Sequence, residues 1–353
     1  MQPAEDTATI AVPAAFAGLR RFALDGALML FDRESGLCVR CEDASTRALR
    51  QCAPQVVQFA ITNHCNLRCS FCSRDLATAS TWTEDSAFVL LSQLAAAGLL
   101  EVAFGGGEPL TFAGFDRLLL RLYDETPLSV SLTTNGLLLD RTRLRAWHHA
   151  DGRPRYGQIR VSIYDDVPWR PTLARLCEQQ ARFGANVLVT PALLPELETR
   201  VLELAALGCT DVLLLAYNGF DAALHVAGEL ARALAQRVHA LADVLRGRVT
   251  IKLDVCWGSR MAAVPRLRPP ADCGAGREFV VVTADRRLAP CSFHEDAVAF
   301  ADATELLALW RARAAAMAVA TSRPGCARRD DFGLAGLDVS VTALRRRCDE
   351  VNP

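Results

Sequence analysis

Short apolar runs alternate with longer amphipathic stretches through the middle of the chain. The apolar runs predict buried strands at residues 56–61, 101–104, 128–133, 158–163, 186–189 and 211–215. The stretch after each run has the apolar spacing of a helix, at residues 84–98, 115–124, 140–150, 172–183, 196–207 and 222–245. Strands that alternate with helices favour a parallel sheet with right-handed crossovers. The pattern therefore predicts an α/β fold of six strand–helix units, fewer than a closed eight-stranded barrel contains.

The two ends of the chain show a different pattern. Residues 1–14 are rich in Ala, Thr and Pro and predict a loose tail. A hairpin follows, with strands at residues 27–31 and 37–41, and then a short helix at residues 45–51. We expect three regions. Residues 1–54 would form the tail, hairpin and short helix, and residues 55–247 the strand–helix units. Residues 248–353 would form a small cysteine-rich region with a strand at 279–282 and a helix at 302–319.

The composition suits a large folded protein without an obvious charged partner. Hydrophobic residues make up 51% of the 353 residues, enough for a substantial core and roughly two domains. The formal net charge of −1 gives no global electrostatic reason to bind nucleic acid or an anionic membrane. No apolar run approaches the ~18 residues of a transmembrane helix, and the polar, acidic start of the chain is not typical of a signal peptide. We therefore expect a cytoplasmic protein that binds neither nucleic acid nor membrane.

Cysteines provide the first chemical signal. There are 13, an odd number in a long chain without a visible export signal, which favours metal ligation over a disulfide framework. Cys65, Cys69 and Cys72 have the spacing C-x3-C-x2-C directly after the first of the six predicted strands. Such thiolates can converge on one soft metal centre. They are one short of the four that usually hold a 4Fe–4S cluster, so one iron would stay open to bind a small molecule. A structural zinc loop, or three unrelated core cysteines, is the alternative.

This loop resembles the signature loop of the radical SAM enzymes. The resemblance implies a partial (β/α)6 barrel in which the open iron holds the amino and carboxylate groups of S-adenosylmethionine (SAM). It also implies that Phe71, just before the last cysteine, packs near the adenine. Gly106-Gly107-Glu108-Pro109 follows the second strand and resembles the GGEP motif of the family, which binds the ammonium of the methionine moiety. A tight turn without a ligand is the alternative interpretation.

Further strand ends match the same family. Thr134-Asn135-Gly136 resembles its TNG turn, and Ser162 stands where family members contact the ribose or the carboxylate. Thr190 ends the fifth strand, where the resemblance places the adenine. The Asp-Gly that usually lies near the fourth strand is replaced here by Tyr-Asp-Asp. All these motifs follow the C-terminal ends of predicted parallel strands, where ligands bind in α/β folds.

More cysteines lie in the C-terminal region, at Cys256, Cys273, Cys291, Cys326 and Cys348. The Cys-x-Ala-Gly that starts at Cys273 and the Pro-Cys that ends at Cys291 resemble the SPASM and twitch domains, which hold one or two auxiliary iron–sulfur clusters. The cysteine cassette of a full SPASM set is absent, so the resemblance implies one auxiliary 4Fe–4S cluster. Its expected ligands are Cys256, Cys273, Cys291 and Cys326, with Cys348 as a competitor. A zinc site on the same thiolates is the alternative.

Other cysteines fit a structural interpretation better. Cys38 and Cys41 form a C-x2-C, but two residues at this spacing point to opposite faces of a strand, which argues against a shared metal. We expect both to pack in the structure. Cys177 in a helix and Cys209 in a turn are expected to be core residues.

Basic residues of the C-terminal region allow two interpretations. Arg286 replaces a glycine of the auxiliary-domain pattern, so we expect that turn to form differently. The runs at residues 328–329 and 345–347 are expected to form a solvated face. A docking patch for an acidic leader peptide is the alternative.

The resemblance implies a reaction but no single substrate. A reduced cluster would cleave SAM to methionine and a 5′-deoxyadenosyl radical, which abstracts hydrogen, with flavodoxin or ferredoxin as electron donor. We favour a precursor peptide made by the ribosome as substrate, modified by a crosslink, a thioether or epimerisation. A dehydrogenase or decarboxylase of a small metabolite is the alternative enzyme, and a structural metal-binding protein is the non-enzymatic one. No acid, base or thiol is singled out as a further catalytic group.

Overall fold

Within residues 7–75, 77–264 and 273–329, which the computed structural model describes, ten strands form one main sheet. Its order is β10-β9-β8-β7-β6-β5-β4-β11-β12-β13, and neighbouring strands from β10 to β11 are parallel. The strands predicted from the apolar runs are β4 (Val56–Thr62), β5 (Glu101–Gly106), β6 (Ser129–Thr134), β7 (Ile159–Ile163), β8 (Phe183–Val189) and β9 (Asp211–Ala216).

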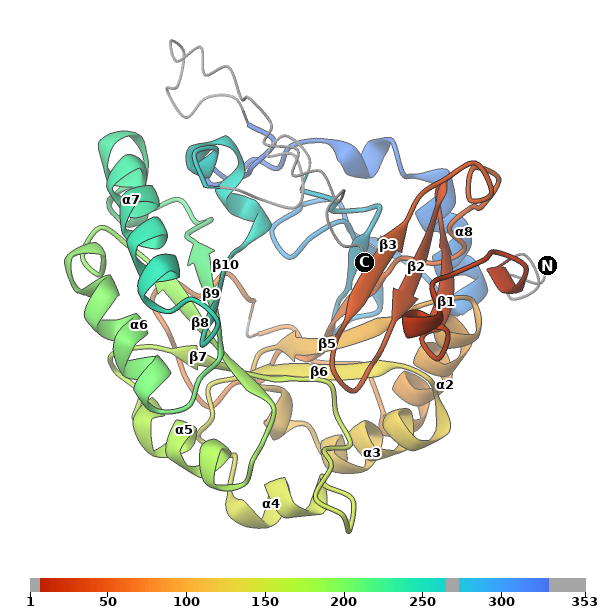
Figure 1. Cartoon of the computed structure of the whole chain (residues 1–353), viewed down its shortest axis with the longest axis horizontal. Coiled ribbons are helices and arrows are strands. Elements are labelled where there is room, and N and C mark those ends of the chain that lie inside the picture. Colours follow the sequence, from red (N-terminus) through yellow and green to blue (C-terminus); the bar gives the residue numbers. More distant parts are fainter. Residues whose placement is uncertain (1–6, 76, 265–272, 330–353) are drawn as a thin grey trace, which may run out of the picture.

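A helix follows each of these strands and covers the outer face of the curved sheet (Figure 1). The helices are α2 (Glu84–Ala96), α3 (Phe115–Glu125), α4 (Arg141–Ala146), α5 (Trp169–Glu178), α6 (Leu197–Ala206) and α7 (Gly228–Val244). Val57, Phe59 and Ile61 alternate along β4 and are fully buried in the same core as Leu91 of α2. The partial (β/α)6 barrel predicted from the sequence is confirmed.

Several element boundaries differ from the predicted ones. The helix α4 ends at Ala146 and α5 at Glu178, and β8 begins at Phe183, the last residue of the helix predicted at 172–183. The long helix begins only at Gly228, because Asp221 caps a separate 3-10 helix, η4 (Ala222–Leu224), and the chain is extended at His225. The C-terminal helix α8 (Ala303–Ala312) is capped by Asp302 and ends before the short η6 (Ala316–Ala318). No helix in the described ranges is both long and apolar enough to cross a membrane.

One strand of the parallel sheet was not predicted. The strand β10 (Thr250–Leu253) pairs with β9 and extends the sheet beyond the sixth unit. Its exposed and half-buried residues alternate, and Ile251 and Leu253 are the half-buried ones. An edge strand with two partly covered apolar positions gives too weak a periodic signal to be separated from a loop.

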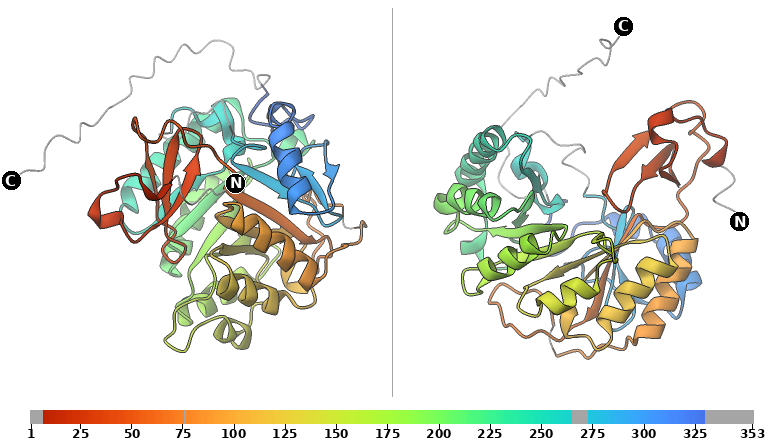
Figure 2. Two further views of the ribbon diagram at one scale, coloured as in Figure 1. Left: turned by 90° about the vertical axis from the view of Figure 1, so that its right-hand side faces the viewer. Right: turned by 60° about the horizontal axis from the view of Figure 1, so that its bottom comes forward.

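The N-terminal region forms its own antiparallel sheet beside the barrel (Figure 2). The predicted hairpin is present as β2 (Ala27–Phe31) and β3 (Cys38–Cys41), with Phe31 opposite Cys38. A third strand, β1 (Arg20–Leu24), pairs with β2. The side chain of Arg33, in the hairpin turn, donates hydrogen bonds to the carbonyls of Tyr123 (2.7 Å) and Thr126 (2.8 Å), which attaches this sheet to the end of α3.

Two N-terminal predictions are wrong. The described part of the predicted tail is held in place, since Ile10 is buried with Leu28 and the Arg21 guanidinium donates to the Ile10 carbonyl at 2.8 Å. The predicted helix at residues 45–51 is a series of turns. The Thr46 hydroxyl donates to the Gly26 carbonyl at 2.8 Å, and such side-chain bonds to the backbone compete with helix formation.

The C-terminal region adds strands to the other edge of the barrel sheet. The predicted strand is β11 (Phe279–Val282), which lies parallel to β4, and it is followed by β12 (Arg287–Ala289) and β13 (Val298–Ala299). Residues before and after position 248 therefore contribute to one sheet, and the three-region division stays a prediction.

The turn between β11 and β12 keeps a glycine-like backbone. Arg286 has φ of 60°, the left-handed conformation that a glycine would adopt freely. The predicted change of turn geometry is therefore wrong. A residue with a side chain is less stable in this conformation by about 1–2 kcal/mol, which destabilises the turn by that amount. The Arg286 guanidinium lies 4.4 Å from the ring centroid of Trp82, a cation–π contact that offsets part of this cost.

Candidate functional site

The loop after β4 carries the first group of thiols. Cys65 and Cys69 are half-buried, and Cys72 is exposed. Burial raises the pKa of the Cys65 thiol, and Glu108 and Cys72 raise it further. Burial also raises the pKa of Cys69, with Cys72 and Cys65 adding to the effect. The three thiols therefore lie close enough to repel one another as thiolates, and bound cations would relieve that repulsion.

The requirements of a single metal ion and of a cluster differ. In the part of the chain that the structure describes, no group of three or more His, Cys, Asp or Glu side chains has the geometry to hold one metal ion. A single ion needs several ligand atoms around one point. A 4Fe–4S cluster does not, because each thiolate ligand binds a different iron of the cluster. Three neighbouring thiols in a partly exposed loop fit this requirement.

The Gly-Gly-Glu-Pro turn after β5 is docked against the cysteine loop. The Gly107 N–H donates to the Thr62 carbonyl at 2.7 Å, and the Glu108 N–H donates to the His64 carbonyl at 2.9 Å. A Cβ on Gly107 would lie 2.1 Å from the His64 carbonyl oxygen, and Gly106 has φ of 110°. Glycine is thus required at both positions, by close approach at one and by backbone conformation at the other.

Glu108 joins the loops that follow β5 and β6. Its side chain is 1% exposed. One carboxylate oxygen accepts from the Leu110 N–H (3.1 Å) and the Thr134 hydroxyl (2.8 Å), and the other accepts from the Asn135 N–H (2.8 Å). Burial raises the pKa of this carboxyl group, and the three hydrogen bonds lower it. The second oxygen keeps one acceptor position, so the predicted contact with a SAM ammonium stays a prediction.

Asn135 ties the loop after β6 back to the cysteine loop. Its side-chain amide donates to the Asn66 side-chain oxygen at 2.8 Å, and its own oxygen accepts from the Leu137 N–H at 3.0 Å. Asn66 lies between the first two cysteines of the motif and was not singled out from the sequence. The loops after β4, β5 and β6 are thus connected directly by hydrogen bonds.

Tyr164 is a site residue that the sequence did not reveal. Its ring centroid lies 4.9 Å from that of Phe71, which comes from the cysteine loop. Burial raises the pKa of the Tyr164 phenol, a hydrogen bond with Ser162 lowers it, and the three loop cysteines raise it. The only sequence signal was the departure from the Asp-Gly of the family at this strand end. Ser162 is buried, and its side chain is hydrogen-bonded to Tyr164.

Thr190 lies at the end of β8, as predicted, and is half-buried. Its hydroxyl accepts a hydrogen bond from the Leu193 N–H at 3.3 Å, which shapes the turn into η3 (Leu194–Glu196). The predicted proximity of Thr190 to the adenine stays a prediction.

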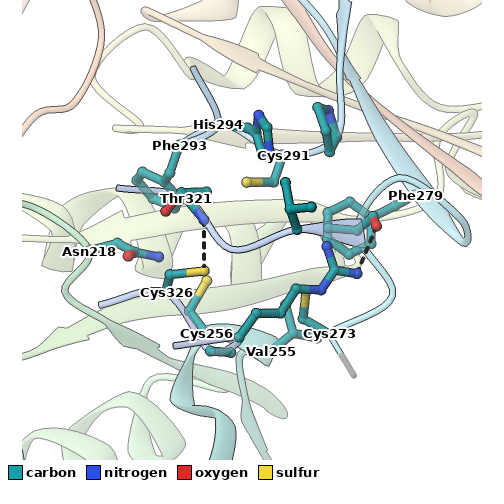
Figure 3. Close-up of a pocket in the computed structure, with 15 residues that line it drawn as sticks. Asn218, Val255, Cys256, Cys273, Phe279, Cys291, Phe293, His294, Thr321 and Cys326 are labelled. Carbon is teal, nitrogen blue, oxygen red and sulfur yellow. Dashed lines mark hydrogen bonds between the residues drawn. The ribbon is translucent and has the colours of Figure 1, made fainter. Parts of the chain in front are cut away.

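A second group of thiols surrounds one cavity in the C-terminal region (Figure 3). The predicted auxiliary ligands Cys256, Cys273, Cys291 and Cys326 all line it. Cys256 belongs to η5 (Val255–Met261), while the other three lie in loops before β11, after β12 and after η6. The fifth candidate, Cys348, lies outside the described residues.

The four cavity thiols interact with one another. Burial raises the pKa of Cys291 to about 11, with Cys273 and Cys326 adding to the shift. The pKa of Cys256 is raised well above its usual value, first by burial and then by Asp254 and the other three cysteines. These groups resist ionisation on their own, whereas metal binding requires thiolates and would supply the missing positive charge.

Arg74 connects the two groups of thiols. Its guanidinium donates to the Ser292 hydroxyl at 3.2 Å, and Ser292 in turn donates to the Gln58 side chain at 3.3 Å. Burial lowers the pKa of Arg74, and the sulfurs of Cys72 and Cys291 act in the opposite direction. No local sequence pattern predicts this contact, because Arg74 and Ser292 are more than 200 residues apart.

The remaining cysteines divide between core and surface. Cys209 is buried, as predicted, and Cys41 is half-buried. Cys38 and Cys177 are exposed, so the prediction that they pack in the core is wrong. Each of these two side chains lies on the solvent-facing side of its strand or helix. The sequence pattern of a short strand, or of a helix without one clearly apolar face, does not predict which side will be exposed.

Basic residues near the cavity are structural. The Arg328 guanidinium donates to the carbonyls of Met317 and Ala275, each at 3.0 Å, and Arg329 donates to the Ser322 carbonyl at 3.0 Å. The predicted solvated face is therefore wrong for Arg328, whose two hydrogen bonds are partly buried, whereas the hydrogen bond of Arg329 is exposed and the prediction stays open for that residue. The second basic run, at residues 345–347, lies outside the described residues.

Known proteins match the part of the chain that carries the first site. Residues 59–165 match the model of the radical SAM superfamily. GTP 3′,8-cyclase of Chlorobaculum tepidum is 32% identical over 156 residues, which are 42% of this chain and 45% of that protein. PqqA peptide cyclase of Rhodopseudomonas palustris is 36% identical over 96 residues, covering 26% of this chain and 25% of that protein. The matches thus span less than half the length of these relatives.

Solved structures extend the similarity to the fold. SuiB of Streptococcus suis bound to precursor peptide SuiA has a TM-score of 0.60 at 16% identity, over 74% of this chain and 65% of that chain. anSMEcpe bound to AdoMet and the Cp18Cys peptide has a TM-score of 0.52 at 14% identity, over 69% and 76%. The matched segment 59–165 contains the cysteine loop and the loops docked against it. This motif-bearing segment matches the radical SAM superfamily, and the chain shares the partial-barrel fold of these solved structures.

Proposed function

We propose that this radical SAM enzyme holds a 4Fe–4S cluster on Cys65, Cys69 and Cys72, binds SAM beside it and modifies a precursor peptide. One observation carries the first part of the proposal. Glu108 and Asn135 connect the loops after β4, β5 and β6, so that three separate sequence motifs form one surface at the C-terminal edge of the sheet. This is the edge at which parallel α/β folds bind their ligands.

The chain supplies position and shielding for the cofactor chemistry. When bound, the cluster and SAM supply a 5′-deoxyadenosyl radical by one-electron cleavage, with methionine as the other product. Gly106 and Gly107 allow the backbone to approach the cysteine loop closely. Phe71, Ser162 and Thr190 are proposed to line the nucleoside site, where the rings of Phe71 and Tyr164, in contact with their planes tilted by 51°, would cover one side and limit access of water. The electron would come from a flavodoxin or a ferredoxin.

The C-terminal cavity is proposed to hold one auxiliary 4Fe–4S cluster. Its support is that four thiols from four segments line one cavity and that the other three thiols add to the raised pKa of Cys256. The cluster would bind the substrate or accept the second electron of an oxidation.

SAM cleavage is tested with protein reconstituted under anaerobic conditions. With dithionite and SAM, we expect 5′-deoxyadenosine and methionine to form, as measured by mass spectrometry. The matched control omits dithionite and should form neither product. Failure to detect 5′-deoxyadenosine with a fully loaded cluster would contradict the proposed function.

Changing Cys273 to alanine tests the auxiliary site. Wild-type protein is expected to contain about eight irons, and the Cys273→Ala variant about four, because a cluster missing one of four ligands assembles poorly. The loop cluster and reductive SAM cleavage should persist, since Cys273 lies in a different group of thiols. Iron and sulfide analysis gives the answer, and an unchanged iron count would exclude Cys273 as a ligand.

A peptide is the favoured substrate class. SuiB and anSMEcpe, with the same fold at low identity, were solved with peptides bound. PqqA peptide cyclase is a relative over part of the barrel. Incubation with candidate precursor peptides, followed by mass spectrometry, should reveal loss of two hydrogens or uptake of deuterium.

A small-molecule substrate is the second candidate. The observation in its favour is the similarity to GTP 3′,8-cyclase over 156 residues. The same assay with GTP in place of peptide distinguishes the small-molecule substrate from the peptide substrate. SAM-dependent consumption of GTP, without change to any peptide, would favour this candidate.

A further inference from the structure

We propose that Asn218 and His294 donate hydrogen bonds to the auxiliary cluster or its thiolates and thereby raise its reduction potential. The inference rests on the proposed auxiliary cluster and adds two specific residues to it. Both side chains line the cavity of the four cysteines (Figure 3). Each has a buried polar atom with no hydrogen-bond partner in the described part of the chain.

Asn218 is the more deeply buried of the two. It follows β9 and is 4% exposed, and its side-chain oxygen has no partner among the described residues. In Figure 3 the amide nitrogen lies on the side of the cysteines and the oxygen on the other side, so the group presents its N–H donors to the cavity. Sulfides and thiolates accept hydrogen bonds but do not donate them, which favours this orientation when a cluster is present.

His294 has its tautomer set by the backbone. The Asp296 N–H donates to Nδ1 of His294 at 3.1 Å, so Nδ1 carries no proton. In the neutral ring the proton is therefore on Nε2. That Nε2 is buried and unpartnered in the residues described. His294 thus holds an N–H donor without an acceptor beside Cys291.

Val255, Phe279, Pro290 and Phe293 in the other walls of the cavity are apolar. Of the polar lining residues, Arg328 is itself a donor, and the Thr321 hydroxyl already accepts from the Arg323 N–H at 3.2 Å. Buried polar atoms in native proteins are almost always hydrogen-bonded, so the orphaned Nε2 donor of His294 points to an occupant that accepts hydrogen bonds. Hydrogen bonds to cluster sulfur stabilise the reduced state, which carries one more negative charge, and so raise the reduction potential.

The test isolates the auxiliary cluster. A variant with Cys65→Ala, Cys69→Ala and Cys72→Ala is expected to retain about four irons, all of them at the auxiliary site. In that background, Asn218→Leu and His294→Leu should each shift the midpoint potential to lower values in a redox titration followed by EPR. His294→Gln keeps an N–H donor at the reach of Nε2 and should restore the potential toward that of the parent.

A second measurement needs no change to either residue. Protein labelled with ¹⁵N-histidine should show nitrogen coupling to the reduced cluster by pulsed EPR, together with exchangeable protons from the N–H groups. A purely structural role would produce neither coupling. Loss of all iron from the triple-cysteine variant would overturn the auxiliary cluster and this inference together. Retained iron with unchanged potentials and no nitrogen coupling would overturn the inference alone.

Discussion

The Cys72→Ala variant is expected to lose SAM cleavage and about four of its irons, the content of one cluster. The reason is that three neighbouring thiols are proposed to hold one cluster with one open iron, and removing any of them leaves too few ligands. Cys72 is the exposed member of the group, so its replacement leaves no core cavity. The measurements are 5′-deoxyadenosine by mass spectrometry and iron by chemical assay.

Cys177→Ala is the matched control. Cys177 is also an exposed thiol of the barrel, but it lies on α5. This variant should keep its iron content and its SAM cleavage. A Cys72→Ala protein that still formed 5′-deoxyadenosine at the rate of Cys177→Ala would contradict the assignment of the loop as the cluster site.

The Gly107→Ala variant is expected to lower SAM cleavage by about 100-fold, the loss typical of a misplacement on the order of 1 Å. Its Cβ would lie 2.1 Å from the His64 carbonyl oxygen and 2.6 Å from that of Asn63. Both are backbone atoms, so the cysteine loop itself must move to make room. Single-turnover formation of 5′-deoxyadenosine measures the effect, and the thermal unfolding temperature should fall as well.

Gly105→Ala provides a control within the same run of glycines. Gly105 has an ordinary backbone conformation, and a Cβ there would meet no atom within 4 Å. Alanine is also better tolerated than glycine inside a strand. We expect this variant to unfold at the wild-type temperature. If Gly107→Ala unfolded and cleaved SAM like Gly105→Ala, the docking of the two loops would have no functional consequence.

Local sequence patterns were enough to predict the barrel and to place the motifs of the first proposed site at its strand ends. Strand and helix periodicity depend on residues a few positions apart, and the six units therefore followed from the chain itself. The spacing of Cys65, Cys69 and Cys72 places three thiols in one loop whatever surrounds them. Glu108 and Asn135 could be placed at strand ends for the same reason, and parallel pairing brings such ends to one edge.

Contacts between distant segments depend on the packing of the whole chain. The four cavity cysteines were expected together only from the family resemblance; they lie on separate segments, and their meeting depends on β11 pairing with β4 at the edge of the sheet. Arg74 reaches Ser292, and Asn218 faces the same cavity as His294, for the same reason. The exposure of Cys38 and Cys177 likewise depends on which face neighbouring elements cover. Periodicity describes neighbours along the chain, whereas these contacts depend on how separate strands and loops are brought together in space.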